Sequence, residues 1–329
     1  DLGLDLVVVP NAHKESLISR VLERLGDKPT PSRPGPDNEL VRPRTRPLVK
    51  IQDGCDNACA YCIVHRLRGR QRSRARDEIV AEVLALREQG AHEVVLTGVH
   101  LGAYGRERGE SLEGLVRHLL DALGPPDSRS DFRVRLSSIE PWDLSPAFFA
   151  LWRDPRLCRH LHLPLQSGCD ATLARMNRHY STAQYAAWVD QARAVIPGLA
   201  VTTDVIAGLP GETPEEHADS AAFCARMQFA RMHVFSYSER PGTPAAEMSD
   251  QVPVPRRRAR AEQLKAIGRE SAVAFQRKFL GQTLPVVVEK RRARGPGVEG
   301  WWTGLTDNYL RVYLWSSEAL GNTVCAVRL

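Results

Sequence analysis

The chain has 329 residues, of which 43% are hydrophobic, and it carries a formal net charge of +6 at pH 7. The length predicts about two domains, and no run approaches the roughly 20 consecutive apolar residues that a membrane-spanning helix requires. Seven cysteines are too few for a disulfide-stapled scaffold, so we expect a cytoplasmic protein in a reducing compartment, with no membrane partner. The positive charge is compatible with a polyanionic partner but does not identify one.

The amino-terminal part of the chain contains two segments that precede the main pattern. Residues 1–26 have the pattern of a strand followed by a helix. Residues 27–46 are rich in proline and charged side chains, which is typical of a linker. We therefore expect the first large domain to cover residues 47–280.

Strands and helices alternate through this large domain. Amphipathic helical patterns lie between most of the strand-like segments, and one of them starts with Thr213 as N-cap and Glu216 completing a capping box. Such alternation predicts a parallel sheet with helical crossovers. Six units over about 200 residues favour an α/β fold with a partial (β/α)6 barrel of the TIM type over a complete eightfold barrel. The strand-like segments are residues 48–52, 93–98, 132–138, 161–166, 200–208 and 231–238.

The carboxyl-terminal part has a different composition. A long basic helix is predicted over roughly residues 255–279, and short β-rich runs separated by turns follow it. Such runs are typical of a small antiparallel barrel. We therefore expect a boundary near Gln282 and a second, all-β domain over residues 281–329.

Unusual residues gather directly after the six predicted strands. Parallel strands present their carboxyl ends at one edge of the fold, and that edge is where α/β proteins place ligands. Glycine also serves plain turns, but six such segments at one edge predict a ligand site there. The segments are "DGCDNACAYC", "GVHLGAYG", "SIEP", "QSGC", "GLPGET" and "SERPGT".

Three cysteines lie close together in the loop after the first strand. Cys55, Cys59 and Cys62 are separated by three and then two residues. Structural zinc takes four protein ligands, no fourth cysteine is nearby in the sequence, and His65 follows Cys62 too closely to complete such a site comfortably. A four-iron cluster with only three thiolates instead leaves one iron open to another ligand. The methionyl part of S-adenosylmethionine (SAM) could chelate that iron, and an electron from the cluster could then break the sulfonium bond.

The cysteine loop and seven further segments together resemble the radical SAM methylthiotransferases. Within this family the chain is most similar to the MtaB-type branch, which methylthiolates N6-threonylcarbamoyladenosine beside the tRNA anticodon. Residues 281–329 resemble the family's RNA-binding TRAM domain, a small OB-like barrel, and residues 1–26 resemble the tail of its N-terminal domain, so we expect an N-terminal truncation. The segments are "KIQDGCDNACAYCIV", "RGRQRSR", "VVLTGVHLGAYG", "RVRLSSIEP", "LHLPLQSG", "LARMNRHYS", "TTDVIAGLPGET" and "HVFSYSERPGTPA".

The resemblance implies which residues hold the cofactors at the first strand. Cys55, Cys59 and Cys62 become the ligands of a [4Fe-4S] cluster. Tyr61, between the last two of them, matches the aromatic side chain that borders the adenine of SAM. The resemblance identifies no individual catalytic residue.

Residues on the other strands are implied to line the cofactor or substrate pocket. Thr97 and Gly98 match the segment that faces the methionyl amine. The others are Gln166, Ser167, Asp204, Ile206 and Gly208. The residues themselves leave other roles open: Asp204 could be a buried capping carboxylate, Gly208 could serve only its turn, and Gln166 could satisfy backbone groups at the strand end.

The remaining cysteines depart from the family pattern. Family members carry three more cysteines in the N-terminal domain, which bind an auxiliary [4Fe-4S] cluster implicated in sulfur supply, and the tail resembling that domain has none. Cys158, Cys169, Cys224 and Cys325 do not match that motif, and we expect them to be small buried residues. This chain should therefore bind one cluster and cleave SAM, but should not complete sulfur insertion unless the missing part is supplied.

Basic side chains occur in two runs that suggest contact with RNA. From Arg66 to Arg76 every second residue is arginine, and an extended conformation would place all six on one face. Near the C-terminus we expect RNA contacts from Lys290, Arg291, Arg292, Arg294 and Arg311, beside the aromatic residues Trp301, Trp302, Tyr309 and Tyr313. The alternative is that the basic runs are solvated surface and the aromatic residues fill a small barrel's core.

Together these features predict a tRNA (N6-L-threonylcarbamoyladenosine-C2)-methylthiotransferase that uses SAM and a [4Fe-4S] cluster. The expected partners are tRNA and an electron donor such as flavodoxin or ferredoxin, and the protein is expected to be a monomer. Two alternatives remain open at this point. The substrate could be a ribosomal protein, as in a sister branch, or the chain could be a non-catalytic RNA-binding protein.

Overall fold

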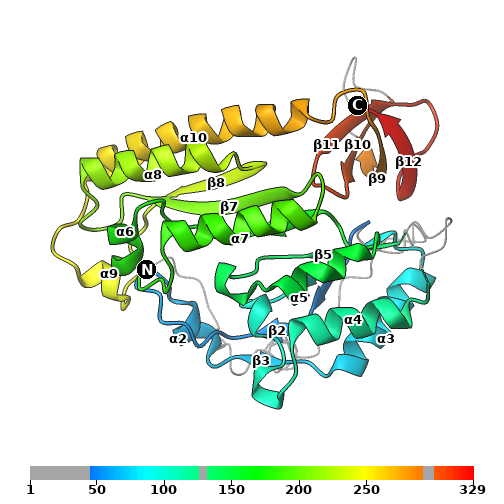
Figure 1. Cartoon of the computed structure of the whole chain (residues 1–329), viewed down its shortest axis with the longest axis horizontal. Coiled ribbons are helices and arrows are strands. Elements are labelled where there is room, and N and C mark those ends of the chain that lie inside the picture. The colour runs from blue at the N-terminus through cyan, green and yellow to red at the C-terminus, as the bar shows by residue number, and fades with distance from the viewer. Residues whose placement is uncertain (1–44, 126–131, 292–299) are drawn as a thin grey trace, which may run out of the picture.

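The computed structural model describes residues 45–125, 132–291 and 300–329, which form a helix-wrapped barrel and a smaller β-domain (Figure 1). The expectations for residues 1–44, which include the remnant of an N-terminal domain and most of the linker, lie outside the described residues. The same holds for Arg292 and Arg294 of the predicted RNA-binding set.

Six parallel strands form the large domain, in two three-stranded sheets with the orders β1-β4-β5 and β6-β7-β8. The strands are β1 (Leu48–Lys50), β4 (Glu93–Thr97), β5 (Arg133–Leu136), β6 (His160–His162), β7 (Ala200–Ala207) and β8 (Arg231–Ser236). An isolated parallel bridge between Ser138 and His162 continues the pairing from one sheet to the other. All four strand pairings in these sheets are parallel, which confirms the predicted α/β partial barrel.

Helices cover the outer face of the barrel (Figure 1). The long ones are α3 (Arg76–Glu88), α4 (Leu112–Ala122), α7 (Thr182–Val195), α8 (Pro214–Met227) and α10 (Val254–Arg277). The predicted capping box of α8 is confirmed, because the Thr213 hydroxyl accepts from the Glu216 amide at 3.2 Å and the Glu216 carboxylate accepts from the Thr213 amide at 3.1 Å. None of the described helices is both long and apolar enough to cross a bilayer.

Shorter elements occupy the connections around the barrel. They are β2 (Gln52–Asp53), α2 (Val64–Arg68), β3 (Arg72–Ser73), α5 (Pro146–Phe149), α6 (Asp170–Arg175) and α9 (Pro244–Glu247), with 3₁₀ turns at Leu101–Ala103, Arg106–Arg108, Pro141–Asp143 and Ala150–Arg153. The antiparallel pair of β2 and β3 brackets the cysteine loop. These elements therefore shape the edge at which the predicted ligand site lies.

The alternating arginines do not share one face, because residues 66–76 do not form the extended run that this arrangement requires. The segment folds into α2, β3 and the start of α3. Gly69, at a φ of 72°, ends α2 by donating from its amide to the His65 carbonyl, because a left-handed residue is needed there and glycine adopts it without strain. Arg68 and Arg72 then lie 3.8 Å from the Asp53 carboxylate, and Arg74 pairs with Glu82.

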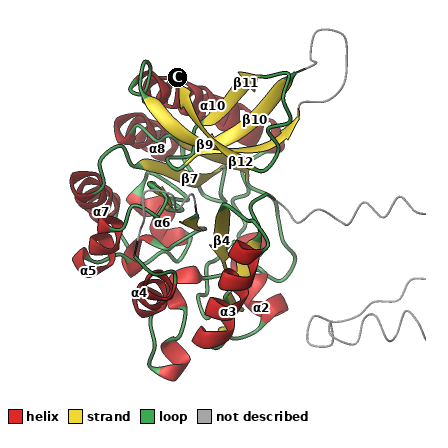
Figure 2. Cartoon of the chain, turned by 90° about the vertical axis from the view of Figure 1, so that its right-hand side faces the viewer, coloured by secondary structure: helices red, strands yellow, loops and turns green. Residues whose placement is uncertain are grey.

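The carboxyl-terminal domain is a four-stranded antiparallel sheet with the order β11-β10-β9-β12 (Figure 2). Its strands are β9 (Thr283–Arg291), β10 (Trp301–Thr306), β11 (Arg311–Trp315) and β12 (Thr323–Arg328). Val286, Val288, Trp302 and Val312 pack into its core, so one of the aromatic residues fills the interior as the alternative expectation held. Tyr313, by contrast, is 55% exposed. The arrangement fits the predicted small all-β domain.

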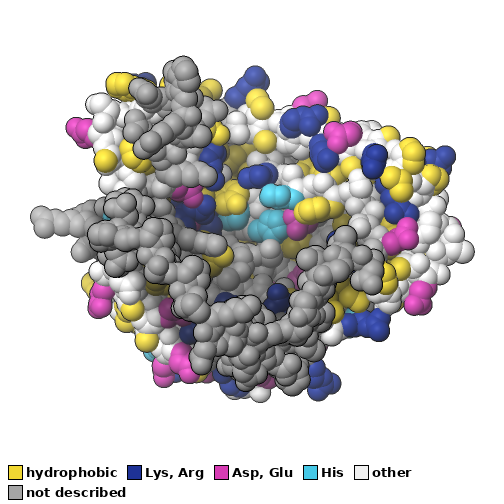
Figure 3. All heavy atoms as spheres, turned by 180° about the vertical axis from the view of Figure 1, so that it is seen from behind, with side chains coloured by type: hydrophobic (Ala, Val, Ile, Leu, Met, Phe, Trp, Pro, Cys, Tyr) yellow, Lys and Arg dark blue, Asp and Glu magenta, His cyan; other side chains and the backbone are white. Residues whose placement is uncertain are grey.

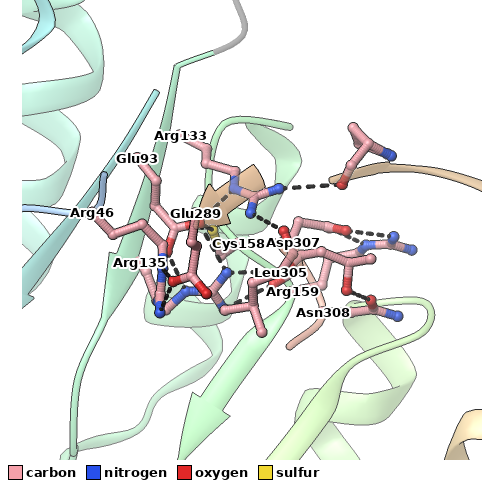
Figure 4. A network of polar contacts seen from close by, with 12 residues as sticks. Arg46, Glu93, Arg133, Arg135, Cys158, Arg159, Glu289, Leu305, Asp307 and Asn308 are labelled. Carbon is pink, nitrogen blue, oxygen red and sulfur yellow. Dashed lines mark hydrogen bonds and ion pairs between the residues drawn. The ribbon is translucent and has the colours of Figure 1, made fainter. Parts of the chain in front are cut away.

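A buried ionic network joins this sheet to the amino-terminal ends of the barrel strands (Figure 4). The fully buried Glu93 carboxylate accepts from Arg133 at 2.6 Å and from Arg135 at 2.7 Å. The same guanidinium groups donate to the carbonyls of Leu305 and Thr306 at 2.7 and 3.0 Å. Burial alone would raise the pKa of Glu93, but the charges of Arg135 and Arg133 lower it to about 2.

Candidate functional site

The cysteine loop is anchored at both ends by backbone contacts. Gly54 opens it at a φ of 76°, and a Cβ at this position would lie 2.0 Å from the Arg70 carbonyl oxygen, so only glycine fits. The Cys55 amide donates to the Gly69 carbonyl at 3.1 Å, and the Ala60 amide donates to the Met176 carbonyl at 3.0 Å. The loop is thereby fixed between the β2–β3 pair and the turn after α6.

The three thiols of this loop lie close enough together for Cys55 and Cys59 to affect the pKa of Cys62. Cys59 is buried, while Cys55 and Cys62 are partly exposed. Burial raises the pKa of the Cys62 thiol, the Val64 amide opposes that rise, and the nearby Cys59 and Cys55 add to it. A bound metal centre would favour the thiolate form of Cys62 against this rise, because a coordinated thiol is deprotonated.

The donor set of the loop, three thiols, suits an iron–sulfur cluster in its chemistry. In the described part of the chain, no three His, Cys, Asp or Glu side chains are arranged to hold one metal ion. In a cuboidal cluster each thiolate binds a different iron atom, so the three sulfurs need not converge on one point. Three thiols in one loop, without a fourth ligand, are the set such a cluster takes when one iron stays open.

A buried guanidinium lies against the cysteine loop. Arg178, whose side chain is 1% exposed, places Nη1 3.6 Å from the Cys59 sulfur and 3.1 Å from the Glu140 carboxylate. Its guanidinium also packs over the rings of Trp142 and Tyr180, at 4.7 and 5.2 Å from their centroids. Sequence reasoning missed this residue, although "LARMNRHYS" contains it, because its partners Cys59 and Glu140 are 119 and 38 residues away along the chain.

A second positive group lies beside the loop on the segment after β4. His100 contacts Asp143 at 2.8 Å, and both side chains are less than 5% exposed. Burial alone would lower the pKa of His100, but hydrogen bonds to Asp143 and Cys55 raise it to about 9. The imidazole is therefore charged at neutral pH next to a cysteine of the loop. Sequence reasoning placed "GVHLGAYG" at this edge but gave His100 no role.

Thr97 and Gly98 lie at the end of β4, where Gln52 ties this strand to the cysteine loop. The Thr97 carbonyl accepts from the Ile51 amide at 2.9 Å. The Gln52 side chain accepts from the amides of Val99 and His100 and donates to the Gly54 carbonyl at 2.9 Å. A Cβ on Gly98 would lie 3.0 Å from the Gln52 side chain, so glycine permits this close approach. The predicted contact of Thr97 and Gly98 with the methionyl amine stays a prediction.

A pocket of about 320 Å³, here called the rim pocket, opens beside the cysteine loop. Four of the predicted residues line it together: Tyr61, Gln166, Asp204 and Ile206. Gln166 pairs with β7 through its backbone, since its amide donates to the Asp204 carbonyl at 2.8 Å and its carbonyl accepts from the Ile206 amide at 2.9 Å. The Asp204 side chain is 31% exposed, so it is not the buried capping carboxylate of the alternative expectation.

Ser167 and Gly208 lie behind the rim pocket rather than in its wall. Ser167 is 1% exposed, and its hydroxyl accepts from the Cys169 amide at 3.2 Å. Gly208 has a φ of 78° and donates to the Glu212 carboxylate at 3.1 Å, with Arg257 packed against it. Both residues support the turns around the pocket, and their direct contact with a cofactor stays a prediction.

The other cysteines lie outside the loop. Cys158, Cys169 and Cys224 are buried, and Cys325 is partly buried on β12. Burial raises the pKa of Cys158 and that of Cys224 to about 12, so both thiols are protonated at neutral pH. These contacts agree with the expectation that the dispersed cysteines are small packed residues.

The predicted RNA-binding residues are only partly described. Lys290 and Arg291 belong to β9, and Arg311 starts β11, where its guanidinium forms an ion pair with Glu289. Glu289 also pairs with Arg46 at 2.6 Å. The contact of these residues with RNA stays a prediction.

The barrel and its carboxyl-edge site define an α/β fold that solved radical SAM proteins share. The radical SAM methyltransferase TsrM from Kitasatospora setae superposes with a TM-score of 0.53 at 18% identity, covering 62% of this chain and 38% of that one. Coproporphyrinogen III oxidase (HemN) from Escherichia coli gives 0.50 at 15% identity, covering 81% of this chain and 68% of that one. Residues 49–224 match the radical SAM superfamily, and the chain belongs to this superfamily.

Curated relatives are more similar in sequence. The threonylcarbamoyladenosine tRNA methylthiotransferases MtaB of Thermotoga maritima and Bacillus subtilis are 38% and 35% identical over 285 and 289 residues. The tRNA-2-methylthio-N(6)-dimethylallyladenosine synthase of Desulfitobacterium hafniense is 35% identical over 284 residues. These alignments cover 85–87% of this chain but 62% of each relative. Membership of the superfamily implies SAM and a [4Fe-4S] cluster as cofactors.

Proposed function

We propose that the protein is a radical SAM methylthiotransferase that acts on N6-threonylcarbamoyladenosine beside the anticodon of tRNA. The observation that carries this proposal is the cysteine loop beside the rim pocket, combined with 38% identity to the MtaB of Thermotoga maritima. The alternatives of a ribosomal-protein substrate and of a non-catalytic RNA-binding protein have no such support from the relatives described above.

The proposal assigns distinct tasks to the residues at the carboxyl edge. Cys55, Cys59 and Cys62 would hold the cluster, which supplies the electron that cleaves SAM when both cofactors are bound. Arg178 and His100 would offset the negative charge of the sulfurs, because each places a positive group beside a cysteine of the loop. The rim pocket would take the adenosyl part of SAM against Tyr61, Gln166, Asp204 and Ile206.

Sulfur supply sets the limit of what this chain can do alone. Three of the four cysteines outside the loop are buried, so we infer that residues 1–329 provide ligands for one cluster. The chain would then cleave SAM, whereas transfer of the methylthio group would need the auxiliary cluster of the family from outside these residues. The further partners in the proposal are tRNA and an electron donor such as flavodoxin or ferredoxin, in the cytoplasm, with the protein as a monomer.

Two measurements test the proposal. After anaerobic reconstitution, the chain should contain iron and sulfide and should form 5′-deoxyadenosine from SAM in the presence of a reductant. In a strain that lacks the gene, mass spectrometry of tRNA nucleosides should show loss of the 2-methylthio group from threonylcarbamoyladenosine. A chain that binds only zinc under anaerobic conditions, or a deletion strain with unchanged nucleosides, would overturn the proposal.

A further inference from the structure

A second cavity, here called the lumen chamber, lies inside the barrel and continues from the rim pocket. It has a volume of about 440 Å³ and shares Asp204 and Phe235 with the rim pocket. Its wall combines polar and apolar side chains: His160, His162 and His233 come from β6 and β8, and Leu48 and Leu136 are among the apolar residues. Figure 3 shows histidine side chains gathered in a hollow of the molecule, beside arginine or lysine and hydrophobic side chains.

Two residues that line the lumen chamber each carry a buried polar atom that lacks a hydrogen-bond partner among the described residues. These are Nδ1 of His160, a residue that is only 4% exposed, and the buried hydroxyl oxygen of Ser137. Buried polar atoms are nearly always hydrogen-bonded in native proteins, because leaving one unpaired costs about 1–3 kcal/mol. Both residues line the lumen chamber, so these two atoms mark a polar part of its wall.

One hydroxyl fixes the histidines of the wall. The Thr202 oxygen lies 2.9 Å from Nε2 of His160 and 2.9 Å from Nδ1 of His162. Because a hydroxyl has one hydrogen, it donates to one imidazole and must accept from the other. His160 also stacks on Tyr309 of the carboxyl-terminal domain, with ring centroids 4.1 Å apart. These contacts therefore hold the two imidazole rings in defined orientations.

The floor of the lumen chamber carries an excess of positive charge. Figure 4 shows most of the network at this end, in which Arg159 and Asp307 pair with each other. The other ion pairs join four guanidinium groups to two carboxylates, a difference of two positive charges: Arg46, Arg133, Arg135 and Arg311 against Glu93 and Glu289. Arg46 and Arg135 line the chamber, and the Arg46 side chain is 20% exposed. An anionic group is thus favoured at this end, where the surroundings screen charge less than water does.

We infer that the lumen chamber binds the N6 substituent of the substrate adenine and selects a substituent that carries a carboxylate. The inference rests on the proposed function and names the residues that choose the substrate. A threonylcarbamoyl group bears a carboxylate, a hydroxyl and a urea, which suit Arg46 and the polar side chains of the wall, among them Ser137 and His160. A dimethylallyl group bears none of these and would leave the polar side chains of the wall without a polar partner.

The relation of the two cavities places the adenine between them. Phe235, which is 52% exposed at their junction, offers an aromatic face on which an unpaired base can stack. From there the substituent extends to the floor, and the adenine stays next to the rim pocket where SAM is proposed to bind. Arg46 is accordingly a specificity residue, without a part in cleaving SAM.

The test compares anticodon stem-loop RNAs that differ only at the modified adenosine. The 329-residue chain is titrated with the threonylcarbamoyl RNA, its methyl ester, the dimethylallyl RNA and the unmodified RNA. We expect the carboxylate form to bind at least about tenfold more tightly than the ester, because the ester removes the charge and keeps the shape. Equal affinity for acid and ester overturns the inference, while equal affinity for all four RNAs overturns the proposed function as well.

Two variants locate the effect at the chamber. Arg46→Gln should reduce the ratio of acid to ester affinity to about one, and Arg46→Lys should restore part of it. The matched control is Arg311→Gln. Arg311 pairs with Glu289 as Arg46 does, but it does not line the chamber. It should weaken all RNAs alike and keep the ratio. An unchanged ratio in Arg46→Gln, with thermal unfolding showing a folded protein, contradicts the assignment.

Discussion

The two ends of the barrel treat charge in opposite ways. At the amino-terminal end, the Glu93 carboxylate is fully buried, and Arg133 and Arg135 surround it together with carbonyls of the second domain. At the carboxyl end, the positive groups of Arg178 and His100 lie beside the sulfurs of a partly exposed loop. One end is completed by the protein itself, and the other is arranged for groups that the chain does not contain. Stability should therefore depend on the first end and cofactor binding on the second.

The largest expected effect comes from removing a sulfur at the carboxyl end. Cys59→Ala should abolish the cluster, because the remaining two thiols cannot satisfy three irons. Iron content and visible absorbance after anaerobic reconstitution measure this loss. Cys158→Ala is the matched control, since that thiol is buried away from the loop, and it should keep the iron. Equal iron content in both variants would show that the cysteine loop does not bind the cluster.

Glu93→Gln should have the largest effect on stability. It leaves the guanidinium groups of Arg133 and Arg135 buried without a counter-charge, which should cost about 3–5 kcal/mol in the free energy of unfolding. Urea unfolding of the apoprotein measures the change. The control Glu82→Gln breaks the half-exposed pair with Arg74 and should cost no more than about 1 kcal/mol. Similar losses in the two variants would contradict the distinction between the ends.

The same carboxylate predicts how stability responds to acid. Because the folded-state pKa of Glu93 is about 2, below its ordinary value of 4.5, its contribution is fully present above about pH 4.5 and is lost as the pH falls through 2. Unfolding free energies measured from pH 6 downward should decline less steeply in Glu93→Gln than in the unaltered chain. Parallel curves would show that other carboxylates govern acid unfolding.

A smaller effect is expected from Arg178→Met, which removes the buried charge beside Cys59 and retains the length of the side chain. Affinity for the cluster should fall roughly 10- to 100-fold, and the reduction potential should become more negative, because the negative sulfurs lose a positive neighbour. Iron retention during chelator challenge and a redox titration followed by EPR report these changes. Arg175→Met, which breaks a pair with Glu216 and leaves the contacts of the cysteine loop with Arg178 in place, should change neither.

The smallest effect is expected at the turn that precedes α8. Thr213→Ala removes the capping hydroxyl and should lower the free energy of unfolding by about 1 kcal/mol without altering iron content. Thermal unfolding and iron analysis of the same preparation provide the check. Loss of iron in this variant would mean that the carboxyl edge cannot be separated into structural and cofactor-binding residues.

Local sequence patterns were sufficient to predict the barrel. Strand and helix periods, and the capping box of Thr213 and Glu216, depend on residues close together in the chain, and the structure confirms them. Position at strand ends also brought Gln166, Asp204 and Ile206 into one pocket with Tyr61. Such contacts follow from topology, since the carboxyl ends of parallel strands meet at one edge.

Contacts between distant parts of the chain could not be predicted in the same way. The period of two in the arginine run does not reveal that Gly69 ends a helix within it or that β3 pairs with β2. Arg178 and Cys59 are 119 residues apart, and no local pattern marks their encounter. The buried ionic network likewise joins Glu93 to a turn near Leu305, and the sequence around one of these residues does not predict its contact with the other.

The buried ionic network also limits how the two domains can move relative to each other. Arg133 and Arg135 each donate to carbonyls across the domain boundary, so separating the domains would expose two cations and an anion that folding has dehydrated. The network therefore holds the carboxyl-terminal sheet against the barrel in one orientation. An RNA bound to that sheet would therefore be held at a fixed distance and orientation relative to the barrel.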